Sequence, residues 1–241
     1  FGKINSVHSH ALPFVNKPNA YLNFFGEEGL NDEGVQLSWL VPNHAFFQEL
    51  TVEVTDGPRE SPSFSRSGIN HYMTLAHLKN FWDLTPNATL ELGLSGVSGQ
   101  NPSGNTTNIG AVDLTYKWKP VKYNTYKSFT FQNELFFCNA RFDNFTANSI
   151  GWYSLMNVQV SKRWFVSGRY DYSNAPGSSQ FVEQAGSATL GWYATEFQKI
   201  ELEGKATSAN KEVAQNNFEK NYVQAFLRWI FVIGTHGAHQ Y

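Results

Sequence analysis

The segment Tyr222–Ile233, with the sequence YVQAFLRWIFVI, alternates between two kinds of side chain. One set is apolar and consists of Val223, Ala225, Leu227, Trp229, Phe231 and Ile233. The other set contains Tyr222, Gln224, Phe226 and Arg228. Because successive side chains of a β-strand point to opposite faces, this period of two predicts a strand with one apolar face and one mixed face.

The same alternation recurs along the chain, between clusters of Gly, Asn and Ser. Further segments with this period are Leu50–Thr55, Leu90–Gly96, Val112–Lys119, Val166–Tyr172 and Lys199–Ala206. These patterns predict an all-β protein with about twelve antiparallel strands. We expect one domain over residues 1–241.

The composition favours strands that cross a membrane. Only 16% of the residues are charged and 16% are aromatic, whereas soluble domains have about 25% charged residues. No run of about 18 apolar residues is present, which excludes transmembrane helices. A transmembrane β-barrel needs an apolar side chain only at every second position, so it fits a mean hydropathy of −0.39. The net charge of −2, without long runs of one sign, gives no indication of nucleic-acid binding.

Charged residues recur on the polar faces of the predicted strands. A soluble sandwich would turn these faces to solvent, whereas a barrel in lipid would turn them toward a wet lumen, and alternation alone does not separate the two. For a barrel, the predicted pore-lining residues are Glu53, Glu91, Asp113, Lys117, Lys119, Arg169, Asp171, Glu201, Glu203, Lys205 and Arg228.

The links between strands favour the barrel. Short links at Leu84–Asn87, Ser161–Trp164 and Ala194–Phe197 alternate with longer polar links, as in outer-membrane barrels. The longer links are predicted at Asp56–Asn70, Ser98–Thr107, Asn139–Ser149, Ser173–Gln184 and Thr207–Asn221. Aromatic residues near the predicted strand ends would form girdles at the lipid–water boundary, and they include Phe46, Trp82, Trp118, Tyr153, Trp164 and Trp192.

The beginning of the chain departs from this pattern. Phe1–Ile4 is predicted to be a strand, and Val7–Gly34 is too long for a turn and too apolar for an exposed loop. Long segments without regular structure in compact proteins are usually functional or disordered. We expect Val7–Gly34 to fold into the lumen and narrow it.

Two pairs of histidines suggest a metal site. His8 and His10 would share one face of a strand, and His236 and His239 lie near the C-terminus, so barrel closure could bring all four to one Zn²⁺. The alternative is that both pairs are hydrogen-bonding residues at the barrel rims. No other cofactor is predicted.

Catalytic patterns are absent from the sequence. It has no Gly-x-Ser-x-Gly elbow, and no serine and histidine stand at a spacing with mechanistic meaning. Cys138, the single cysteine, follows Phe136 and Phe137 and is predicted to be a packed thiol. We therefore expect that the protein is not an enzyme.

Four stretches resemble one family of bacterial outer-membrane proteins. They are Phe1–Pro13, Glu27–Gly34, Lys162–Asp171 and Ile233–Tyr241. The family is described as zinc-regulated outer-membrane receptors or as relatives of phosphate-selective porins. The resemblance implies an outer-membrane β-barrel with more strands than this chain holds. No plug domain precedes the predicted strands, which gives energised uptake no support.

The lumen predicted from these patterns is mixed in charge. Its acidic residues balance its lysines and arginines, which argues against a strong preference for anions. The leading hypothesis is a porin-like channel for passive diffusion of small polar solutes or ions, in contact with outer-membrane lipid and lipopolysaccharide. The alternatives are a scaffolding barrel that binds other envelope proteins, a zinc-linked uptake protein, and a soluble all-β binding protein.

Overall fold

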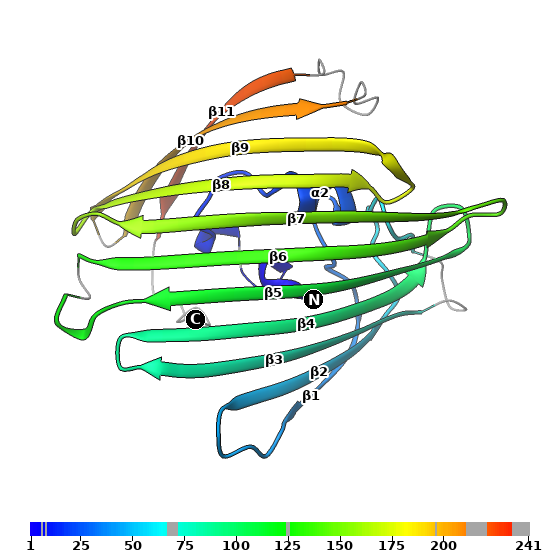
Figure 1. Ribbon diagram of the computed structural model, residues 1–241, viewed down its shortest axis with the longest axis horizontal. Coiled ribbons are helices and arrows are strands. Elements are labelled where there is room, and N and C mark those ends of the chain that lie inside the picture. The colour runs from blue at the N-terminus through cyan, green and yellow to red at the C-terminus, as the bar shows by residue number, and fades with distance from the viewer. Residues whose placement is uncertain are drawn as a thin grey trace.

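One antiparallel β-sheet forms the body of the molecule (Figure 1). The computed structural model describes residues 1–5, 7, 9–66, 72–123, 126–195, 197–210 and 221–232. In this part of the chain the sheet has 11 strands, which confirms the all-β prediction and replaces the expected number of about twelve. The strands are β1 (Gly34–Leu40), β2 (Phe47–Thr55), β3 (Met73–Thr85), β4 (Ala88–Gln100), β5 (Thr106–Trp118), β6 (Ser128–Arg141), β7 (Thr146–Gln159), β8 (Trp164–Ala175), β9 (Ser178–Thr195), β10 (Gln198–Ala209) and β11 (Asn221–Phe231).

Each strand pairs with its neighbours in sequence, so the strand order is β1 to β11 without a crossover. Every pair is antiparallel, and β1 and β11 therefore run in the same direction. Within the described residues β1 pairs with β2 and β11 pairs with β10, and no ladder joins β1 to β11. The sheet thus has two edges.

Two of the predicted long links are wrong. Phe142–Phe145 connects β6 to β7 and Pro176–Gly177 connects β8 to β9, so most of Asn139–Ser149 and Ser173–Gln184 is strand. Polar side chains continue these ladders across the strands, as in the bond of 2.7 Å from Asn139 Nδ2 to Asn148 Oδ1. Half of Ser98–Thr107 is also strand, and residues 101–105 form its link. Long and short links therefore do not alternate strictly.

The two faces of the sheet have opposite polarity. On the convex face Leu227 is 73% exposed and Trp229 is 68% exposed. On the concave face Glu201 is 2% exposed and Glu203 is fully buried. The other strands repeat this distribution, since Val35, Val54, Leu94, Val166, Leu190 and Leu202 are all exposed. The apolar face points outward and the charged face points inward.

The described residues between 1 and 32, which we call the N-terminal segment, lie against the concave face, behind the central strands in the view of Figure 1. They contain the short helices α1 (Gly2–Asn5), η1 (Ser9–Ala11) and α2 (Asn19–Phe25), while a fourth, η3 (Val121–Tyr123), links β5 to β6. The strand predicted at Phe1–Ile4 is therefore wrong. Four residues are too few to separate a period of two from a helical period, and both Phe1 and Ile4 pack into the same core.

None of the helices in the described residues combines the length and the apolar character that a membrane-spanning helix requires.

Candidate functional site

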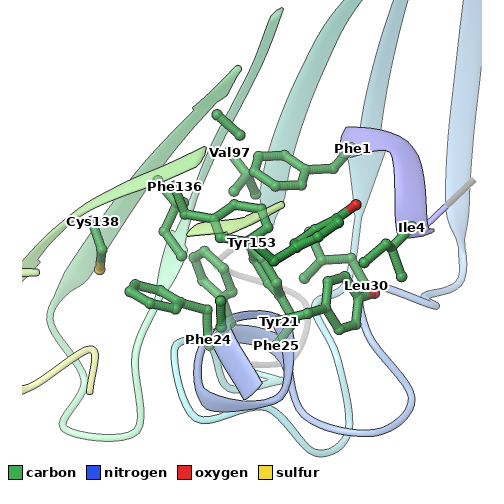
Figure 2. Packing of buried hydrophobic residues seen from close by; sticks show 14 of the residues in the cluster. Phe1, Ile4, Tyr21, Phe24, Phe25, Leu30, Val97, Phe136, Cys138 and Tyr153 are labelled. Atoms are coloured by element: carbon green, nitrogen blue, oxygen red, sulfur yellow. The ribbon is translucent and has the colours of Figure 1, made fainter. Parts of the chain in front are cut away.

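An aromatic cluster fixes the N-terminal segment at one end of the sheet (Figure 2). We call this the loop end, where β2 ends and β3 begins, and the opposite end the turn end. The ring of Phe136 on β6 lies 6.0 Å from that of Phe24 and 5.4 Å from that of Phe25. Gly151 on β7 makes room for this contact, because a Cβ atom there would lie 2.7 Å from the Phe24 ring. Helix α2 therefore packs in one defined position.

A band of buried charges holds the segment along β8 and β10. Glu203 Oε2 accepts hydrogen bonds from the backbone N–H groups of Val15 at 2.6 Å and Asn16 at 3.0 Å. Arg169 donates to the Asn16 carbonyl at 2.7 Å and pairs with Asp171 at 2.9 Å and with Glu203 at 3.3 Å. These interactions supply the partners that buried ions require.

Further charged residues of the concave face extend this band. Asp171 accepts a hydrogen bond of 3.1 Å from the Asn19 backbone N–H, and Lys205 donates to the side-chain oxygens of Asn16 and Asn19. On the last strand, Arg228 donates to the Leu12 carbonyl at 2.8 Å and pairs with Glu201 at 2.6 Å. Asn23 in α2 donates to Glu183 of β9 at 2.7 Å.

Lys3 in α1 forms the third anchor. Its ammonium group lies 2.7 Å from Glu91 of β4, and its backbone N–H donates to Glu134 of β6 at 3.0 Å. Glu134 also accepts a hydrogen bond of 2.9 Å from the Tyr153 hydroxyl. The prediction that Tyr153 belongs to a lipid-facing girdle is therefore wrong, because its side chain points inward and is fully buried. Its neighbour Trp152 takes the opposite face, as the alternation of β7 requires.

The predicted pore-lining residues divide into three groups. Arg169, Asp171, Glu201, Glu203, Lys205 and Arg228 form the buried band described above, and all but Glu201 contact the segment directly. Glu53, Glu91, Asp113 and Lys117 line cavities. Lys119 follows the end of β5 and is exposed.

Three cavities lie in series along the segment. The first, of about 540 Å³, is at the loop end and shares Asn31 and Asp32 with the second. The second, of about 460 Å³, lies between α1 and the inner face of β1–β5, and we call it the acidic cavity. It shares Lys3 and Val7 with the third, of about 430 Å³, which lies at the turn end. Neighbouring cavities in this series therefore share lining residues, from one end of the sheet to the other.

The predicted zinc ligands are mostly outside the described residues, namely His8, His236 and His239. His10 lies in η1 and lines the cavity at the turn end. The part of the chain that the structure describes contains no group of three or more His, Cys, Asp or Glu that could hold a metal ion. Zinc binding stays a prediction from the sequence.

The sequence did not lead us to predict which residues of the N-terminal segment bind the charged side chains of the sheet. Lys3, Asn16 and Asn19 are anchors, and Ser167 donates to the Pro13 carbonyl at 3.0 Å. A signal was present, because a semi-apolar segment rich in asparagine offers partners for buried charges. Cys138 is buried, in agreement with a packed thiol.

The chain is similar to an uncharacterized protein of Aquifex aeolicus (strain VF5). The two are 26% identical over 281 aligned positions, which cover all of this chain and 58% of the relative. The chain therefore spans less than two thirds of the length of that protein. No family model matches the chain, and no solved structure matches it.

Proposed function

We propose that the chain forms the wall of a bacterial outer-membrane β-barrel and acts as a channel for passive diffusion of small polar solutes or ions. The observation that carries this proposal is the reversed polarity of the sheet. Soluble monomers rarely expose contiguous apolar patches above a few hundred Å². Here exposed Val, Leu, Trp and Phe side chains recur from β1 to β11 on one face. Hydrocarbon outside and water inside would satisfy both faces at once.

Aromatic side chains at the turn end support a membrane boundary. Exposed rings recur there on β1, β2, β5, β8 and β11 and in the link between β9 and β10, namely Trp39, Phe47, Trp118, Trp164, Phe197, Trp229 and Phe231. Trp164 and Trp192 stack at 6.1 Å across β8 and β9. Rings of this kind favour the interface, where one part contacts lipid and another contacts water.

The series of cavities supports a route for solutes past the N-terminal segment. Lys3 and Val7 line both the acidic cavity and the cavity at the turn end, and Asp32 stands between the acidic cavity and the loop end. In a barrel this route would run along the lumen beside β1–β5. The segment would then narrow the lumen, as an in-folded loop does, rather than close it.

The strand directions constrain how such a barrel closes. Because β1 and β11 run the same way, an all-antiparallel barrel needs an odd number of strands beyond the 11 described. Bacterial barrels of this class have an even total, which agrees. Strands outside the described residues would supply the remainder.

A scaffolding barrel is the second candidate, and the filled interior favours it. Conductance in a planar lipid bilayer separates the two functions. The purified protein is expected to give discrete current steps that are proportional to voltage, and heat-denatured protein at the same detergent concentration is the control. Protein that inserts into the bilayer but gives no current steps would favour the scaffolding barrel over the channel. The zinc-linked alternative depends on residues outside the described part.

A further inference from the structure

We infer that the acidic cavity is a binding site for small cations, and that it makes the lumen cation-selective. Cation selectivity rests on the proposed channel function. Cation binding does not, because it can be measured without any current.

The charges that line the acidic cavity are predominantly negative. Among the described residues its carboxylates are Asp32, Glu49, Glu53, Glu91 and Asp113, and its lysines are Lys3 and Lys79. Both lysines pair with Glu91, at 2.7 and 3.5 Å. Glu91 therefore forms both lysine ion pairs, and the other four carboxylates also line the cavity.

Glu49 and Asp113 have lysines in their surroundings but form no ion pair with them, since Lys79 lies opposite Glu49 across β2 and β3 and the charges of Lys3 and Lys79 also act on Asp113. In the described part of the chain, no lysine, arginine or histidine nitrogen forms an ion pair within 4.0 Å of Glu49, Glu53 or Asp113. Among the described lining residues, the five carboxylates outnumber the two lysines.

Asp113 points independently to a ligand. It is only 1% exposed, it lines the acidic cavity, and its Oδ2 atom has no hydrogen-bond partner among the described residues. A buried carboxylate oxygen normally has a partner, because burial without one is costly. Gly93 on β4 leaves the space that this carboxylate occupies, since a Cβ atom there would overlap Oδ2. A cation in the cavity would supply the missing interaction.

The neighbouring cavity at the loop end continues the acidic surface. It is lined by Glu28, Asp32, Glu33, Asp56 and Glu60, against Arg59 and Arg66. Arg66 pairs with Asp56 and Glu33, and Arg59 pairs with Glu33. A cation that enters from the loop end thus meets excess negative charge before it reaches Asp113, and such charges set the sign of selectivity in pores.

The first test is the zero-current potential of the intact protein in a planar bilayer, under an about tenfold gradient of KCl. The inference predicts that K⁺ is preferred over Cl⁻. Glu53→Gln is expected to lower the permeability ratio roughly fourfold, the change that one unit charge about 5 Å away produces in water. Asp113→Asn should act in the same direction. The control, Asp143→Asn, removes an exposed carboxylate in the link between β6 and β7 and should leave the ratio unchanged.

The second test is calorimetric titration of the detergent-solubilised protein with the diamine putrescine. Saturable binding that weakens in Glu53→Gln and not in Asp143→Asn supports the cation site, even if no current is found and the channel proposal fails. Current steps with equal or greater permeability to Cl⁻ would overturn the inference and leave the channel standing. The inference also fails if putrescine does not bind, or if Glu53→Gln changes neither the binding nor the permeability ratio.

Discussion

At the scale of single residues, the concave face depends on buried charges that bind the N-terminal segment. Glu203 accepts two backbone hydrogen bonds from the segment and lies 3.3 Å from Arg169. Buried ions of this kind add little net stability compared with apolar residues, but removal of one partner leaves the other charge without compensation. Their role is therefore to fix where the segment lies.

Glu203→Ala should consequently be strongly destabilising. It removes one of the two carboxylates that pair with Arg169 and leaves the backbone N–H groups of Val15 and Asn16 without their acceptor, and such losses reduce the free energy of unfolding by about 3–5 kcal/mol. Urea titration of the refolded protein in lipid vesicles measures the change. Glu60→Ala, at an exposed position, is the control. A loss of under about 1 kcal/mol in Glu203→Ala would contradict the anchoring role.

Asp32 should make stability depend on pH. Burial raises its pKa to about 6, and the nearby carboxylates of Asp56 and Glu53 act in the same direction, against Arg66 and a hydrogen bond from Thr55. The folded protein then holds the Asp32 proton more tightly than the unfolded chain, whose pKa is about 3.9. The stability from this group is present at low pH and is lost as the pH rises through about 6. Unfolding titrations across this range should show a shallower decline for Asp32→Asn, and identical slopes would refute the assignment.

At the scale of elements, α2 is held by shape as well as by charge. Gly151→Ala would place a methyl group 2.7 Å from the Phe24 ring, and overpacking of this kind costs about 1–3 kcal/mol. The matched control is Gly168→Ala on β8, where an added Cβ has no atom within 4 Å. Limited proteolysis of residues 1–32 should be faster in Gly151→Ala than in the control. Equal rates would mean that α2 is not held against β7.

Elements that local sequence patterns determine could be predicted, whereas those that depend on contacts between distant parts of the chain could not. The faces of β11 follow from alternation alone, so Leu227 and Arg228 were assigned to opposite sides correctly. The ends of β6 and β7 did not follow, because polar pairs such as Asn139 and Asn148 continue a ladder that composition predicts as loop. The partner of Glu203 could not be predicted either, since Asn16 lies 187 positions away.

At the scale of the whole molecule, the central feature is the direction in which each face of the sheet points. The chain places its charges on the side of the sheet that the N-terminal segment covers and its apolar side chains on the side that nothing in the described residues covers. Covering such a face would be favourable, because burial of apolar surface contributes about 25 cal/mol per Å². In the proposed outer-membrane barrel, lipid would provide that burial.

The most direct test is spin-label accessibility in lipid vesicles. Cysteines would replace Leu190, Leu202 and Leu227 one at a time in a Cys138→Ala background, and Thr130, which lines the cavity at the turn end, would be the inward control. The account predicts that labels at the three leucines collide with oxygen dissolved in lipid and are protected from a water-soluble nickel chelate, unlike the label at Thr130. Leucine labels that are open to the chelate, with the protein folded, would contradict it.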